Sequence, residues 1–325
     1  MIIVRSPLRV SFFGGGTDYE KWFLKNKGAF LSTAIDKYVF SLVKHTINLS
    51  DFRYRISWKI VEEVSNCNQI QQPIVRETIK YLKFDRPAEF FYLADVPALS
   101  GLGSSASYAV ATIKAISSIQ KKKLSKSEVA KISYEIEKQK LNENTGIQDA
   151  IAASYGGLNF VEISKNGKYK VNKCLVNNKQ KENFFNRIVL VFTGIQRSSS
   201  DQAALTLKEM DKKEKHFRDL YCMAFEGRNL LLSNELDKFG NLLDESWKIK
   251  SSLNKNMSNT KIDNLYEFSK SEGALGMKIL GAGGGGFAAI FLKKGFKRKF
   301  LEKIKNHKFM EIKIDEVGAK LINFS

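Results

Sequence analysis

The sequence predicts an α+β protein with two domains. The chain has 325 residues, more than a single hydrophobic core usually serves. Patterns typical of strands and of helices are mixed along it without a regular β-α-β alternation, which argues against a doubly wound sheet. A polar segment at 166–183, rich in Lys, Asn and Gln, is the best candidate for a junction. We therefore expect one domain at 1–183 and a second at 184–325.

The first half of the chain has the patterns of several strands and two consecutive helices. Apolar residues recur at helical spacing behind a glycine-rich turn and predict a helix over 104–120. A second helix is expected to begin at Ser125, because Glu128 stands three residues later and completes a capping box. Strands are expected at 2–5, 38–45, 90–94 and 158–163.

The second half has a different order of predicted strands and helices. An apolar run predicts a strand at 188–192, and about three helical stretches follow between residues 200 and 272. A further strand is expected at 287–292, directly after a cluster of glycines. Each half therefore mixes strands with helices, as an α+β domain does.

Composition is that of a folded protein without a membrane segment. Hydrophobic residues make up 43% and charged residues 27% of the chain. No apolar run reaches membrane-spanning length and the first residues have no signal-peptide pattern, so we expect a cytoplasmic protein that does not bind membranes. The three cysteines are scattered and the three histidines lack metal-ligand spacing, so neither disulfides nor a zinc site is expected.

The net charge of +19 favours anionic ligands. Lysines are spread along the chain, with small clusters at 121–123 and 293–298 that are typical of solvated helix faces. No basic motif with interleaved aromatic residues is present, so nucleic acid is not an expected partner. The positive field fits phosphorylated small molecules better.

A glycine-rich loop at 97–106 opens directly into the helix expected from residue 104. Glycines allow the backbone to approach a ligand, and the free N–H groups and positive end of a helix attract phosphate. The loop is not a Walker A motif, because no Gly-Lys-Ser/Thr follows. A simple N-cap with a tight turn is the alternative. The candidate phosphate-binding residues are Pro97, Ser100, Gly101, Leu102, Gly103, Ser104, Ser105 and Ala106.

A second glycine cluster occupies 281–286, with five glycines in six positions. Such a run costs conformational entropy on folding, which favours a function over a flexible hairpin turn. Because the chain already has one phosphate loop, we expect the two loops to wall a single nucleotide site. The nucleotide-binding candidates in this cluster are Gly281, Gly283 and Gly284.

Charged residues suitable for phosphoryl transfer occur in two other segments. Arg9 precedes the turn that ends in Asp18; the arginine could neutralise a transferring phosphoryl group and the aspartate could bind a sugar hydroxyl, although an Asp after glycines is often a turn residue. Glu137 and Asp149 could divide the tasks of holding a metal and handling a hydroxyl proton. A solvated helix residue and an N-cap are the alternatives for these two carboxylates.

Together, the segments at 7–18, 97–106 and 278–287 resemble the three motifs of the GHMP kinase superfamily, in order and in spacing. Within that superfamily, the sequences at 14–19 and 146–149 resemble those of the D-glycero-D-manno-heptose 7-phosphate kinases. The resemblance to that branch continues at residues 156–157, 245–248 and 273–274.

The resemblance implies a two-domain GHMP kinase fold, with an amino-terminal domain like ribosomal protein S5 domain 2 and a ferredoxin-like carboxy-terminal domain. It implies ATP and Mg²⁺ as cofactors and transfer of the γ-phosphoryl group to a sugar or sugar phosphate, with the anomeric hydroxyl of the heptose 7-phosphate as the leading acceptor. A homodimer is compatible with it. Acceptors like galactose, fucose or mevalonate, and a non-catalytic homologue that binds a nucleotide or metabolite, remain alternatives.

The resemblance also implies roles for individual residues. Asp149 matches the catalytic carboxylate, and Arg9 matches the cation near the transferred phosphate. Ser105 and Glu137 match the magnesium ligands. The residues implied in substrate binding are Thr17, Asp18, Arg197, Gly284 and Gly285. Two departures from the branch pattern, Met277 and Ala150, are expected near the pocket and put its substrate in question.

Overall fold

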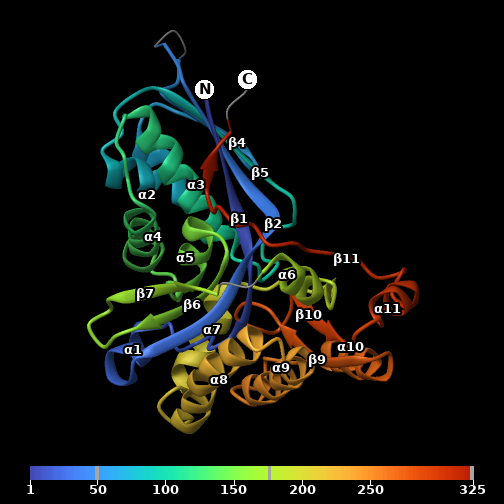
Figure 1. The fold of residues 1–325 in the computed structure, drawn as a ribbon. Helices are drawn as coiled ribbons and strands as arrows, with labels where there is room; N and C mark the ends of the chain where they lie inside the picture. The colour runs from blue at the N-terminus through green and yellow to red at the C-terminus, as the bar shows by residue number, and fades with distance from the viewer. Residues whose placement is uncertain (48–50, 175–176, 323–325) are drawn as a thin grey trace.

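The computed structural model describes residues 1–47, 51–174 and 177–322, and over these residues it contains one eight-stranded and one four-stranded sheet, covered by helices (Figure 1). This arrangement confirms the expected α+β class. The larger sheet has the strand order β12-β1-β2-β5-β3-β4, with β6 and β7 extending from β2. Its strands are β1 (Ile2–Phe13), β2 (Gly28–His45), β3 (Tyr54–Ser57), β4 (Val61–Val64), β5 (Ala88–Ala94), β6 (Leu158–Ile163), β7 (Tyr169–Lys173) and β12 (Lys320–Leu321).

Helix α3 (Ser104–Ile119) forms the centre of the first half. It packs on β1 and β2 and is flanked by α2, α4 and α5. The expected capping box at the start of α4 is confirmed, since the Ser125 hydroxyl accepts from the Glu128 N–H and the Glu128 side chain accepts from the Ser125 N–H. The other helical elements here are α1 (Glu20–Asn26), η1 (Cys67–Gln69), α2 (Pro73–Leu82), α4 (Lys126–Glu135), the π-helical η2 (Ile136–Lys140) and α5 (Gln148–Tyr155).

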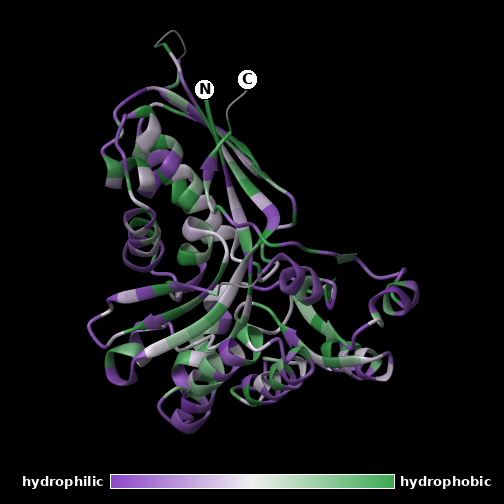
Figure 2. Cartoon of the chain, viewed as in Figure 1, coloured by the Kyte–Doolittle hydropathy of each residue, from purple (hydrophilic) through white to green (hydrophobic). Residues whose placement is uncertain are grey.

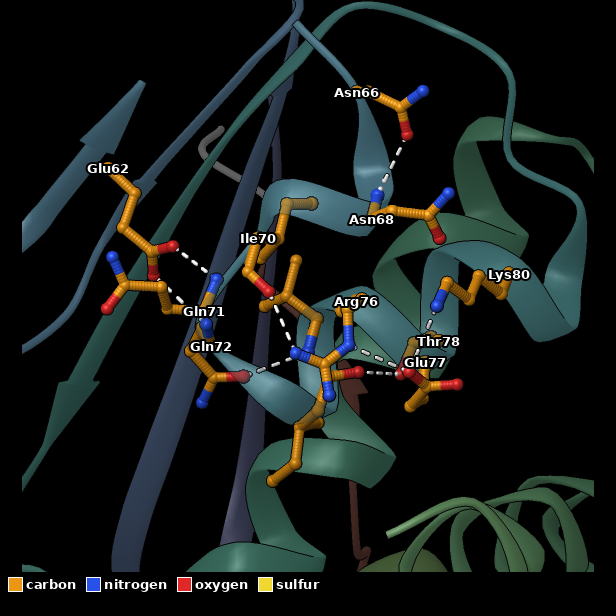
Figure 3. Close-up of polar contacts among 12 residues, drawn as sticks. Glu62, Asn66, Asn68, Ile70, Gln71, Gln72, Arg76, Glu77, Thr78 and Lys80 are labelled. Carbon is orange, nitrogen blue, oxygen red and sulfur yellow. Dashed lines mark hydrogen bonds and ion pairs between the residues drawn. The ribbon is translucent and has the colours of Figure 1, made fainter. Parts of the chain in front are cut away.

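A buried carboxylate fixes the chain where it leaves β4 and enters α2 (Figure 3). Glu62 accepts hydrogen bonds from the backbone N–H groups of Gln71 and Gln72. Arg76, one turn into α2, donates to the carbonyl of Ile70 at 2.9 Å. Charge-assisted bonds of this kind are stronger than neutral ones, so this segment is held firmly against the sheet.

The smaller sheet has the order β11-β8-β10-β9 and is antiparallel throughout. Numbered along the chain this is the order 4-1-3-2, with helices after the first and third strands, which is the expected ferredoxin-like arrangement. Its strands are β8 (Ile188–Phe192), β9 (Ala274–Ile279), β10 (Phe287–Leu292) and β11 (Phe309–Met310). The helices are α6 (Asn178–Phe185), α7 (Ser199–Glu209), α8 (Glu214–Leu232), α9 (Leu236–Ser251), α10 (Thr260–Ser271) and α11 (Lys297–Lys303).

The two sheets share a hydrophobic core. Phe12 from β1 lies edge-on to Phe184 of α6 and to Phe239 of α9, with ring centroids 5.4 and 5.5 Å apart. Phe239 in turn contacts Phe291 of β10 at 5.4 Å. Hydrophilic positions are frequent along outer helices such as α8 and α11 (Figure 2). The two halves are therefore joined by packed aromatic rings and not only by the chain.

Several element boundaries differ from the expectation. β1 continues to Phe13 because it pairs with β2 along its full length, with register shifts near Pro7 and Ser11. β2 begins at Gly28, where it pairs with β6. The polar segment at 166–183 is not a plain junction: it contains β7, which pairs with β6, and most of α6. The chain also returns at its far end, where β12 pairs with β1, so these residues belong to the first sheet.

No helix within the described ranges combines the length and apolarity needed to cross a bilayer.

Candidate active site

The two glycine-rich loops lie against each other. A Cβ at Gly281 would be 2.9 Å from the Gly101 Cα, and one at Gly101 would be 2.7 Å from the Leu280 carbonyl oxygen. Both glycines have positive φ, 78° at Gly101 and 68° at Gly281. The Phe287 N–H donates to the Ser100 carbonyl at 3.0 Å and ties the loops together. Only glycine allows this close crossing, which explains its presence in both loops.

The first loop presents the amino end of α3 to a cavity. The N-cap, Gly103, has φ 77° and supplies no capping side chain, so the free N–H groups of the first turn remain available to an anion. Ser104 and Ser105 line the cavity together with Gly101 and Gly103. The amino end of a 16-residue helix is thus open to the cavity, at the place where the sequence predicts phosphate binding.

The other predicted residues of this loop do not line the cavity. Leu102 is fully buried in the main core and Ala106 is buried beside it. Ser100 is fully buried and its carbonyl accepts from Phe287, so it anchors the loop. Pro97 is exposed outside the cavity. These four residues position the loop, while Gly101, Gly103, Ser104 and Ser105 face the cavity.

The cavity has a volume of about 140 Å³ and lies between the amino-terminal sheet, α5, α9 and the second glycine loop. Arg9, Asp18, Asp149 and Gly281 all line it. A larger groove of about 1180 Å³, bordered by α6, α9 and α11, contains none of the residues predicted for the site. The smaller cavity is therefore the candidate active site.

Arg9 and Asp149 form a bidentate ion pair within the cavity. The Arg9 Nε donates to Asp149 Oδ1 at 2.7 Å and Nη2 donates to Oδ2 at 2.8 Å. The third nitrogen, Nη1, donates to the Gly101 carbonyl at 2.6 Å. A Cβ at Gly103 would approach Asp149 Oδ2 to 3.1 Å, so the loop comes as close to the pair as its backbone allows. The two residues, 140 positions apart, form one rigid unit.

Asp18 lies beside this pair and is buried. It accepts hydrogen bonds from the backbone N–H groups of Gly16 at 3.1 Å and Gln148 at 3.3 Å. Burial raises the pKa of the Asp18 carboxyl, and the neighbouring charge of Asp149 raises it further. An acid in this setting can exchange hydrogen bonds with a ligand hydroxyl as donor or acceptor.

Thr17 supports the turn beneath Asp18. Its side chain is fully buried, and its hydroxyl lies within hydrogen-bonding distance of the Gly14 and Ala29 carbonyls, at 2.8 and 2.7 Å. It also accepts from the Ala29 N–H at 3.1 Å. Thr17 does not line the cavity, so we assign it a supporting role and not the ligand contact expected from the sequence.

Glu137 and Ser105 form the second polar pair. The Ser105 hydroxyl donates to Glu137 Oε1 at 2.6 Å. Glu137 lies in the π-helical turn η2, and burial raises the pKa of its carboxyl to about 8. Among the described residues no cluster of three or more His, Cys, Asp or Glu could hold a metal alone. One carboxylate and one hydroxyl suit Mg²⁺, which usually takes few protein ligands and completes its shell with phosphates and water.

The remaining glycines of the second loop face protein neighbours. Gly283 lies against Met257, and Gly285 lies against Ile195. A Cβ at Gly284 would be 3.2 Å from the Arg197 Cδ. None of these three glycines lines the cavity, unlike Gly281. Arg197 itself is exposed, just before α7 and close to Ser199, which does line the cavity.

The two departures from the branch pattern have buried side chains. Met277 is fully buried in the core of the smaller sheet, and Ala150, on α5 next to Asp149, is buried in a core beside it. Neither side chain lines the cavity, because β9 and α5 turn these positions toward their own cores.

Sequence reasoning missed Lys250, a buried lysine on α9 that lines the cavity. Its Nζ donates to the Gly281 carbonyl. Lys250 follows buried Trp247 by three residues and buried Leu243 by seven, so helical spacing places it on the buried face. That spacing was the available signal. A second buried lysine, Lys278, donates to the Phe12 carbonyl, and burial lowers its pKa.

Known proteins share this architecture. Residues 72–157 match the family model described as GHMP kinases N terminal domain. A D-glycero-alpha-D-manno-heptose 7-phosphate kinase from Campylobacter jejuni is 29% identical over 90% of this chain and 89% of its own length. A mevalonate kinase from Methanocaldococcus jannaschii is 26% identical over 93% and 96% of the two chains. The crystal structure of a D-glycero-D-manno-heptose 1-phosphate kinase from Bacteriodes thetaiotaomicron has the same fold, with a TM-score of 0.83 over the full length of both chains at 20% identity.

The matched family domain contains the glycine-rich loop at 97–106 and Asp149, which both reach the cavity. It also contains Glu137, which bonds to Ser105 at the cavity wall. The similarity to kinases extends over nearly the whole chain. Residues 72–157 therefore match a GHMP kinases N terminal domain, and the chain as a whole is similar to ATP-dependent phosphotransferases that contain this domain.

Proposed function

We propose that this kinase transfers the γ-phosphoryl group of ATP to a sugar phosphate, and that its acceptor is the anomeric hydroxyl of D-glycero-D-manno-heptose 7-phosphate. The observation that carries the proposal is the Arg9–Asp149 pair, held within reach of the amino end of α3. A carboxylate beside a phosphate cradle is what transfer to a hydroxyl requires. The similarity to a heptose 7-phosphate kinase supports the choice of acceptor.

The nucleotide would lie with its phosphates at the crossing of the two glycine loops. The N–H groups that begin α3 and the hydroxyls of Ser104 and Ser105 would bind phosphate oxygens. Glu137 and Ser105 would hold Mg²⁺, which when bound offsets negative charge on the phosphates. Ionised Glu137 is needed for that, so metal binding would release the proton favoured by burial.

Asp149 would accept the proton of the attacking hydroxyl. The acceptor oxygen forms a bond to the γ-phosphorus, the bond to the bridging oxygen breaks, and ADP leaves. Arg9 holds both carboxylate oxygens, which keeps the Asp149 side chain oriented. Asp18 would bind a neighbouring sugar hydroxyl and fix the ring.

The phosphate already on the acceptor would bind near the amino end of α7. Arg197 precedes this helix, and Ser199 reaches the cavity from its first turn. The side chain of Arg197 is exposed and free to swing toward an anion. Replacing Arg197 with Met should raise the KM for a phosphorylated acceptor about 10- to 100-fold and leave kcat and the KM for ATP unchanged.

A steady-state assay with the phosphorylated acceptor and its unphosphorylated analogue would measure this effect. The matched control is Arg218→Met, which removes an exposed arginine of α8 paired with Glu214. Equal KM values for wild type and Arg197→Met would remove Arg197 from the substrate site.

Other acceptors are tested by the same chemistry. A coupled assay over a panel of sugars, sugar phosphates and mevalonate, with the product position read by phosphorus NMR, would identify the acceptor. Activity confined to a non-sugar alcohol would eliminate a sugar as the acceptor. Mevalonate is the specific alternative, because the chain is similar to a mevalonate kinase. Nucleotide binding without phosphorylation of any acceptor would point to a non-catalytic homologue.

A further inference from the structure

The guanidinium of Arg9 is already paired within the protein and has little positive charge left for a phosphoryl group. Each of its three side-chain nitrogens already donates to the protein, two of them to Asp149 and one to Gly101. The bidentate pair with Asp149 neutralises the guanidinium locally. Phosphoryl transfer depends on positive charge and donors placed around the transferring group. Beside the proposed Mg²⁺, a second cationic side chain in the cavity could supply such a donor.

Lys250 is the only lysine or arginine other than Arg9 among the described residues that line the cavity. It lies in the last turn of α9 and its side chain is buried. Its ammonium is held at the crossing of the glycine loops by the bond to the Gly281 carbonyl. An ammonium has three N–H donors, so two more are available after this bond.

The surroundings of Lys250 are charged on several sides. Arg9 from β1 and Lys278 from β9 oppose its positive charge, while Asp18 and Asp149 favour it. Burial lowers the pKa of Lys250 to about 8, and Arg9 adds to this effect. An anion that enters the cavity would favour the charged form. By linkage, affinity for that anion falls as pH rises through this range.

We propose that Lys250 is the free cation of the phosphoryl-transfer centre, and that it donates to the transferring phosphoryl group while Arg9 stays on Asp149. Without nucleotide, the same ammonium holds the two glycine loops together through Gly281. The inference rests on the proposed function, because it assigns a contact in that reaction. The proposal gives Lys250 a contact with the phosphoryl group in addition to its bond with the Gly281 carbonyl.

Two substitutions at Lys250 test the proposal. Lys250→Met should lower kcat about 100- to 1000-fold, the loss typical of removing a donor to developing charge. Lys250→Arg retains a cation and should recover at least tenfold of that loss. The matched control is Lys248→Met, which removes an exposed lysine of the same helix paired with Asp244 and should leave kcat unchanged.

A binding measurement separates this role from a structural one. Calorimetric affinity for a non-hydrolysable ATP analogue should decline above pH 8 in the wild type, and the decline should disappear in Lys250→Arg, since a guanidinium stays charged. The melting temperatures of Lys250→Met and Lys250→Arg, compared with that of the wild type, show how much the bond to the Gly281 carbonyl stabilises the fold. If the Met variant does not fold, the Arg variant and the pH dependence decide.

The outcomes are distinct. Lys250→Met with kcat within threefold of the wild type, or an affinity independent of pH in the wild type, would overturn the role of Lys250. A wild-type protein that phosphorylates no acceptor would instead overturn the proposed function. In that case the pH dependence of nucleotide affinity still tests whether Lys250 contacts the phosphates.

Discussion

Asp149→Asn is expected to lower kcat by about 10³- to 10⁴-fold, the upper range for removing a general base. The asparagine cannot accept the hydroxyl proton, yet it keeps one oxygen for Arg9, so the side chain should stay in place. The phosphate cradle at α3 is untouched. We therefore expect the dissociation constant for ATP to change less than threefold, as measured by calorimetry beside steady-state kinetics.

The control for this variant is Asp211→Asn, which removes an exposed aspartate paired with Lys21 and Lys25 outside the cavity. Its kcat should equal that of the wild type. Should Asp149→Asn retain wild-type turnover, the assignment of the proton to Asp149 would have to be abandoned, while the phosphate-binding role of the loops would stand.

Glu137→Gln should reduce kcat at least 100-fold and raise the Mg²⁺ concentration needed for half-maximal activity. The amide keeps the shape of the side chain and can still accept from the Ser105 hydroxyl, but it lacks the charge that Mg²⁺ favours. A magnesium titration at saturating ATP measures the effect. Unchanged magnesium dependence would exclude Glu137 as a ligand.

The same substitution should stabilise the metal-free protein. Burial raises the pKa of Glu137 from 4.5 to about 8, so the folded protein holds this proton more tightly than the unfolded chain. Between pH 4.5 and 8 mainly the unfolded chain loses this proton, so the free energy of unfolding falls as pH rises, by about 3 kcal/mol at pH 7. Glutamine carries no such cost. Urea unfolding should show Glu137→Gln to be more stable at pH 7 and equal to the wild type near pH 4.5.

Local patterns predicted much of the fold. The strand at 158–163, both core strands of the smaller sheet and the capping box at Ser125 agree with the structure. These elements are indicated by the periodicity of their own side chains and by a capping pair three residues apart. Both signals lie within the sequence of the element itself. Helix α3 was likewise expected within one residue of its observed end.

Features set by distant pairing could not be predicted in this way. Pro7 interrupts the strand pattern of β1, yet the strand continues to Phe13 because β2 pairs with it along its length. The polar residues of β7 read as a junction, and pairing with β6 makes them a strand. Both corrections follow from partners that lie far along the chain.

The candidate site likewise has features that the local sequence predicts and features that only distant contacts determine. Residue chemistry identified Arg9 and Asp149 as candidates, but only the fold shows that they bind each other and not a ligand alone. In the sequence, Lys250 does not differ from the exposed lysines near it. Its bond to the Gly281 carbonyl, 31 residues further along the chain, is visible only in the fold. A charged residue on the apolar face of a helix is the pattern that would have singled it out.

The pairing of β12 with β1 has a consequence for synthesis. During translation the first strand emerges first, but one of its two neighbours, at residues 320–321, is made about 300 residues later. Until then one margin of β1 offers unpaired N–H and C=O groups to any extended polypeptide nearby. The growing chain therefore leaves the edge of β1 at Val4 and Arg5 open to aggregation until residues 320–321 are made and pair with it.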